Sequence, residues 1–381
     1  MLKNRILLVL SCIILSLCIG SIYSWSIFIL PIQELTNFSF TSIQLVFCIT
    51  IFTLGLTTSF GGKFINSIEP YIMSLLGSII FLIGMVCTGF ALIHIPQFIY
   101  ITYGLCIGIA VGIIYLIPIP LLLQEFPNNP ALGSSISILA FGFGSAIFVP
   151  LANLFTSIND AFMYIGLLYG ILMIISSLLL KNKKYQSANR ENNNSLTVNQ
   201  ALKTKEFYYI LGMIFTNILI GIALISIAYP LGLELSLNAA VLVSIIGLCN
   251  GLGRPIWASI ADKIGHIKIY KILFTTQIIS ILLLIFNINY ILTLLSLFLI
   301  ASCYGAGFSC CPALCAKVFG TNHAGEIFGK VLLAWGLAGL IGPFLITLIY
   351  GYFYSYLYSI VLISSLYFIG LYCSVKIKIL I

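Results

Sequence analysis

Long apolar runs, separated by short polar segments, dominate the chain. Polar residues do not alternate with apolar ones inside these runs, as they would in the strands of a membrane barrel. Each run reaches or approaches the roughly 20 residues that a membrane-crossing helix needs. The pattern therefore predicts an all-α membrane protein with twelve transmembrane helices, over residues 6–30, 42–62, 71–93, 97–122, 132–154, 161–180, 207–230, 237–260, 268–287, 290–316, 326–349 and 353–375.

One polar segment divides the predicted helices into six and six. Residues 181–205 are basic and rich in Asn, a composition typical of a flexible linker. We therefore expect an N-terminal six-helix bundle over 1–180 and a C-terminal one over 206–381, joined by a linker over 181–205.

The two predicted bundles also resemble each other. The stretch GGKFINSIEPY (61–71) follows the second span, and ASIADKIGHIK (258–268) follows the eighth. A Gly-rich run precedes Pro118 in the fourth span, and another precedes Pro312 in the tenth. Related halves of this kind indicate a transporter with a substrate site between two bundles, near the middle of the membrane.

Composition and charge placement support this reading. Hydrophobic residues make up 61% of the chain and charged residues 7%, against about 25% charged in soluble domains. Every Lys and Arg except Arg254 falls at a terminus or in a loop after an even-numbered span, whereas the opposite loops hold Glu34, His94, Asp160 and Glu234. The positive-inside rule therefore predicts that both termini are cytoplasmic. The net charge of +8 reflects this orientation, so we expect no nucleic-acid partner.

The N-terminal residues and the cysteines each invite another interpretation. Residues 1–20 begin with basic residues, as a signal peptide does, but the apolar run continues to Pro31, so we interpret it as the first span. The eleven Cys lie mostly inside apolar runs and show no metal-binding spacing, and the three His lie at span ends. We expect neither a metal nor another cofactor.

Arg254 is the exception to the charge pattern. It lies eight residues before Asp262, or roughly 12 Å along a helix, which places it toward the centre of the membrane. Such a charge costs about 2.5–3.5 kcal/mol and normally faces a cavity. All nine acidic residues lie at span ends or in loops, so carbonyls, water or an anionic ligand must satisfy the guanidinium. A carboxylate fits it through two parallel hydrogen bonds, while the alternative is a structural arginine bonded to backbone carbonyls.

Several stretches resemble the oxalate/formate antiporter family of the major facilitator superfamily and, more distantly, the monocarboxylate transporters. They are GSIYSWSIFILP (20–31), GIAVGIIYLIPIPLLLQEFP (108–127), LAFGFGSAIFVP (139–150), NGLGRPIWASIADKIG (250–265) and GAGFSCCPALCAKVFG (305–320). The superfamily's loop signature matches Asp262, Lys263 and Gly265 after the eighth span. The copy after the second span keeps Gly62 but has Asn66 and Ser67 in place of the charged pair. The resemblance implies the twelve-helix major facilitator fold and a gating role for these loops.

The resemblance also implies that Arg254 binds the carboxylate of the substrate. Trp335 stands where the family's oxalate carriers have a lysine, and one cation suits a monoanion such as lactate, pyruvate or formate. Asn250 stands where the monocarboxylate transporters have an aspartate implicated in proton coupling, which favours exchange or facilitated diffusion. Aromatic rings with polar tips can wall a carboxylate pocket, which makes Tyr23, Tyr115 and Trp335 candidates; packing against lipid is the alternative.

We therefore expect a secondary transporter or exchanger of small organic anions that works by alternating access, not an enzyme. It is expected to function as a monomer in the bilayer, with a proton or a counter-anion as the coupled species. A dicarboxylate exchanger of the oxalate/formate type and a carrier of neutral solutes are alternatives within the superfamily. A sensor that binds the anion without moving it, and a membrane enzyme, are alternatives outside it.

Overall fold

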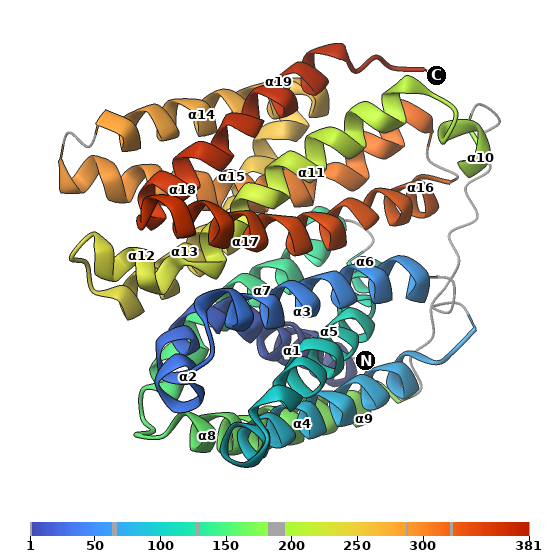
Figure 1. Ribbon diagram of the computed structural model, residues 1–381. Coiled ribbons are helices and arrows are strands. Elements are labelled where there is room, and N and C mark those ends of the chain that lie inside the picture. Colours follow the sequence, from blue (N-terminus) through green and yellow to red (C-terminus); the bar gives the residue numbers. More distant parts are fainter. Residues whose placement is uncertain are drawn as a thin grey trace. The chain divides into compact units, whose positions relative to one another are not determined.

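The computed structural model describes residues 2–62, 67–126, 130–181, 195–286, 289–320 and 323–380, and the regular structure in these ranges is helical (Figure 1). Within this part of the chain, eleven helices or runs of consecutive helices are long and apolar enough to cross a membrane. They are Arg5–Thr36, Phe40–Gly61, Pro70–His94, Pro96–Glu125, Ile158–Leu179, Lys205–Ser226, Ala239–Ile264, His266–Phe286, Tyr290–Phe319, Ala324–Phe353 and Tyr356–Lys376.

These eleven segments coincide with eleven of the predicted spans. The remaining prediction, 132–154, falls on α7 (Pro130–Ala152), which contains the shorter apolar stretch Ile136–Ala152. The count of twelve spans therefore stays a prediction.

The chain forms two compact units. The first contains Met1–Ser187 together with Ile225–Leu248, and the second contains Ala188–Leu224 together with Cys249–Ile381. The divisions fall at the end of α11 (Lys205–Ser226) and inside α13 (Ala239–Ile264). The predicted bundle boundaries at 180 and 206 remain a prediction, and residues 182–194 of the predicted linker lie outside the described residues.

In the first unit, α7 packs along α1 (Leu2–Gly20). A Cβ on Gly20 would overlap the carbonyl of Phe141, and one on Gly144 would overlap the backbone of Gly20, so glycine allows the two backbones to touch. The other helices of this unit are α2 (Ile29–Thr36), α3 (Phe40–Gly61), α4 (Pro70–His94), α5 (Gly108–Tyr115), α6 (Pro118–Glu125), α8 (Ile158–Asp160), α9 (Gly166–Leu179) and α12 (Ala228–Glu234), with 3-10 or π segments at Ser21–Phe28 (η1), Pro96–Phe98 (η3), Tyr100–Ile107 (η4) and Ala161–Ile165 (η5).

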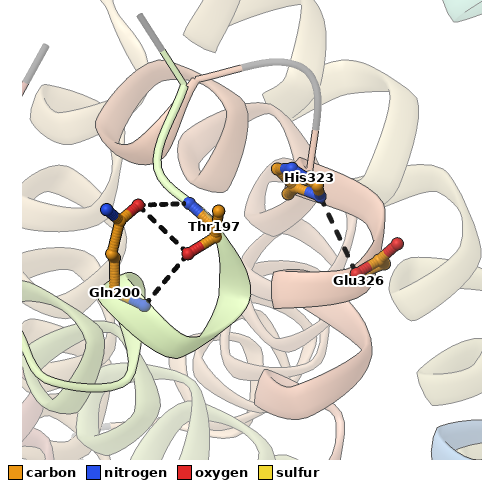
Figure 2. Close-up of polar contacts among 4 residues, drawn as sticks. All are labelled: Thr197, Gln200, His323 and Glu326. Carbon is orange, nitrogen blue, oxygen red and sulfur yellow. Dashed lines mark hydrogen bonds and ion pairs between the residues drawn. The ribbon is translucent and has the colours of Figure 1, made fainter.

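In the second unit, α14 (His266–Phe286) packs against α15 (Tyr290–Phe319) and α19 (Tyr367–Lys376). The remaining elements are α10 (Val198–Ala201), α16 (Ala324–Val331), α17 (Leu333–Phe353), α18 (Tyr356–Ile363) and the 3-10 turn η6 (Ser364–Leu366). Thr197 and Gln200 form a capping box at the start of α10, and His323 lies 3.8 Å from Glu326 at the start of α16 (Figure 2). The backbone N–H of Leu196 donates to the carbonyl of Phe319 at 2.8 Å, which anchors this segment to the end of α15.

Several predicted helix ends differ from the structure by a few residues, and two of these differences concern segments that carry predicted site residues or motifs. The first span continues to Thr36 instead of ending at 30, because Pro31 falls in the first turn of α2, where a missing N–H costs no hydrogen bond. The eighth span continues to Ile264 instead of ending at 260, so Asp262 and Lys263 lie in the last turn of α13. Gly265 ends this helix with a φ of +102°, and its N–H donates to Ala261 at 2.8 Å.

Candidate substrate-binding site

Arg254 is buried in α13, with 2% of its surface exposed. Its Nη2 donates a hydrogen bond to Oδ1 of Asn250 at 3.2 Å, a contact that the i, i+4 spacing on one helix face allows. The residue after it, Pro255, has no N–H, so it removes one hydrogen bond from α13 at this level. Its own helix therefore supplies one of the contacts that orient the guanidinium.

Glycines bring α15 directly against this part of α13. A Cβ on Gly305 would overlap the carbonyl oxygen of Asn250, and one on Gly253 would overlap the carbonyl oxygen of Ser302. Asn250 is fully buried, and its Nδ2 donates to the carbonyl of Ala301 at 3.4 Å. The close approach of the two backbones thus fixes the amide that holds Arg254.

Phe308 links Arg254 to Trp335. The Cζ atom of Arg254 lies 5.4 Å from the centre of the Phe308 ring, within the range of a cation–π interaction. The Phe308 and Trp335 rings meet edge to face, with centroids 4.9 Å apart, and Trp335 is 1% exposed. The second unit therefore brings Asn250, Arg254 and Trp335 together around a ring that the sequence did not single out.

Tyr23 and Tyr115 come together in the first unit. Both rings meet Phe141 edge to face, with centroid distances of 5.1 Å for Tyr23 and 5.7 Å for Tyr115. Tyr23 is 2% exposed and Tyr115 is half-buried. The five predicted substrate-binding residues thus form two clusters, one in each unit.

The residues of the predicted gating motif lie at helix ends. Asp262 Oδ1 is 3.5 Å from Nε2 of His266, one turn further along the chain, and Lys263 is exposed. Gly62 caps α3 with an ordinary right-handed backbone, and a Cβ there would meet no atom within 4 Å. Asn66 lies outside the described residues, whereas Ser67 follows in a turn.

Phe141 and Phe308 are the two residues that sequence reasoning missed. Both lie inside stretches that carried the family resemblance, 139–150 and 305–320. The chain contains 27 Phe, so residue type alone could not select these two. Only the packing of separate helices shows that each lies at the centre of a cluster.

The apolar helices define an integral, multi-pass membrane protein. The Major Facilitator Superfamily model matches residues 10–343. The chain belongs to this superfamily and is a transporter, not an enzyme.

Three relatives match most of the chain. The oxalate:formate antiporter of Oxalobacter formigenes is 26% identical over 346 residues, covering 88% of this chain and 82% of that protein. The MFS-type transporter YhjX of Escherichia coli (strain K12) is 21% identical, covering 89% and 86%. A 38 kDa protein in the 23S RNA operon of Thermoproteus tenax is 22% identical, with the same two coverages of 89% and 86%. The similarity to the oxalate/formate antiporter family is thus shown.

Proposed function

We propose that this transporter moves a small monocarboxylate, such as lactate, pyruvate or formate, by alternating access, with Arg254 binding the carboxylate. The observation that carries the proposal is the buried guanidinium, held by Asn250 and the Phe308 ring. A guanidinium stays charged at any physiological pH, and its planar fork matches a carboxylate. Asn250, Phe308 and Trp335 add no negative charge to this cluster.

Trp335 favours a monoanion over a dianion. The relative from Oxalobacter formigenes is named for oxalate, a dicarboxylate, and for formate, a monocarboxylate. A second carboxylate would need a second cation, and an indole beside Phe308 offers one N–H donor and no charge. Dicarboxylate exchange is the less favoured alternative for this reason, and a carrier of neutral solutes is the other alternative.

Asn250 favours exchange or facilitated diffusion over proton transfer by a side chain. Its amide cannot take up a proton as a carboxylate does. The acidic residues that the structure describes all lie near helix ends or in loops. We therefore propose a counter-anion as the coupled species, or a proton that travels with the substrate.

We propose the remaining parts of the transport unit from the same resemblance. They are twelve helices in two six-helix bundles, cytoplasmic termini, a functional monomer and a gate that uses Gly62, Asp262, Lys263 and Gly265. Tyr23, Tyr115 and Trp335 would line the substrate's path with aromatic surface, which excludes water from a small anion.

Counterflow in proteoliposomes tests the role of Arg254. We expect saturable exchange of labelled monocarboxylates by the unaltered protein and its loss in Arg254→Ala. Arg254→Lys keeps the charge but loses the two-pronged geometry, so it should raise KM at least tenfold. Lys205→Gln, which removes an exposed cation at the start of α11, is the matched control and should retain exchange. Full exchange by a correctly inserted Arg254→Ala protein would refute the assignment.

A further inference from the structure

The junction between α11 and α12 leaves one backbone carbonyl without its usual helical donor. In a continuous helix, the carbonyl of Ser226 would accept from the N–H of residue 230. Residue 230 is proline and has no N–H. Ile227 also leaves helical geometry, with φ −116° and ψ 8°. A buried carbonyl in this position needs a donor from elsewhere.

Gln44 of α3 supplies that donor. Its Nε2 donates to the carbonyl oxygen of Ser226 at 3.0 Å, and both residues are fully buried. Oε1 of Gln44 has no hydrogen-bond partner among the described residues. Burying an amide with an unpaired acceptor costs free energy, so this glutamine is a poor choice for packing alone. Its contribution is the bond to Ser226.

This hydrogen bond ties a segment from the second half of the sequence to the first unit. Residues 225–248 belong to that unit although they follow the linker. Two other contacts hold the same segment: α12 packs against η1, and Gly247 faces Ser145 so closely that a Cβ would overlap its Oγ. Those two contacts are steric, whereas the bond from Gln44 is directional and therefore fixes the position of the proline break.

We propose that Gln44 is a positioning residue of the transport cycle, which holds the proline break of α11 and α12 on the first unit and releases it when that contact opens. In the proposed arrangement of two bundles, Gln44 belongs to the first bundle and Ser226 to the second, and alternating access requires the two bundles to part on one side at a time. Hydrogen bonds between membrane helices are weak enough to break reversibly. The inference depends on transport by the superfamily's mechanism and is independent of which substrate is carried.

Hydrogen–deuterium exchange of the purified protein in lipid nanodiscs tests the proposal without any substrate. Gln44→Met keeps the length of the side chain and removes the donor. We expect it to raise the exchange rate of residues 225–238 about threefold, the factor typical of one hydrogen bond between membrane helices. Peptides from α4 should be unchanged, which shows that the variant is folded. Gln277→Met replaces another fully buried glutamine, in the second unit, and should leave residues 225–238 unaffected.

Pro230→Ala separates a role in positioning from a role in packing. The substitution restores an N–H that can reach the carbonyl of Ser226, so Gln44→Met should have little effect in this background. Counterflow rates should follow the same pattern, with Gln44→Met altering the rate and Pro230→Ala suppressing that change. The proposal is overturned if Gln44→Met leaves exchange at 225–238 unchanged, or if its effect persists at full size beside Pro230→Ala.

Discussion

At the scale of the residue, the candidate site depends on how Arg254 is held. Asn250 accepts its hydrogen bond at 3.2 Å, and Phe308 presents its ring to the guanidinium at 5.4 Å. An amide fixes the direction of the guanidinium without neutralising it, whereas a carboxylate at the same place would do both. Asn at position 250 therefore orients the guanidinium without cancelling its charge, as the proposed carboxylate site requires.

Asn250→Asp tests this reasoning through pH. The new carboxylate would pair with Arg254 and compete with the substrate, so we expect KM for monocarboxylate exchange to rise about tenfold or more near pH 7. Pairing with Arg254 lowers the pKa of the new carboxyl, so it stays ionised and KM should remain raised at every pH between 5 and 8. Counterflow measured across this range checks the prediction. A KM that matches the unaltered protein across this range would show that position 250 does not face the charge.

At the scale of the element, glycines decide how closely α13 and α15 approach. Gly305 faces the carbonyl of Asn250, and Gly253 faces the carbonyl of Ser302, so both helices contribute to the contact. The spacing of small residues predicts close approach in general. It does not identify the partner helix, because several apolar helices with similar stripes compete for the same face.

Gly305→Ala should therefore destabilise the protein, because the added Cβ would overlap the carbonyl oxygen of Asn250. Overpacking of this kind costs about 1–3 kcal/mol, and we expect a lower apparent unfolding temperature in detergent together with weaker exchange. Gly329→Ala in α16 is the matched control, since a Cβ there meets nothing within 4 Å. That variant should be unchanged or slightly more stable, by up to about 1 kcal/mol. Equal melting of both variants would contradict the close approach of α13 and α15.

At the scale of the whole molecule, the sequence predicted the type and number of most elements and much less of their contacts. Length and apolar composition predicted the eleven spans because lipid imposes one simple constraint on each helix. The contact between Arg254 and Asn250 could be predicted because one helix turn separates the two residues, and Arg254 drew notice because a charge inside an apolar run is rare. Their role as a binding site stays a prediction. Phe308, Phe141 and the bond from Gln44 to Ser226 were not, since each depends on helices that are distant in sequence.

Orientation and the twelfth span form one linked prediction, because each crossing reverses the side of the following loop. If both termini are cytoplasmic, α7 must cross the membrane, since eleven crossings would place the termini on opposite sides. We expect alkaline phosphatase fused after residue 126, before α7, to be inactive in a bacterial host, and the same enzyme fused after residue 156 to be active. A fluorescent protein fused after residue 380 should fluoresce, as it does only in the cytoplasm. Equal phosphatase activity on both sides of α7 would show that this helix does not span the membrane and would reverse the assigned side of every later loop.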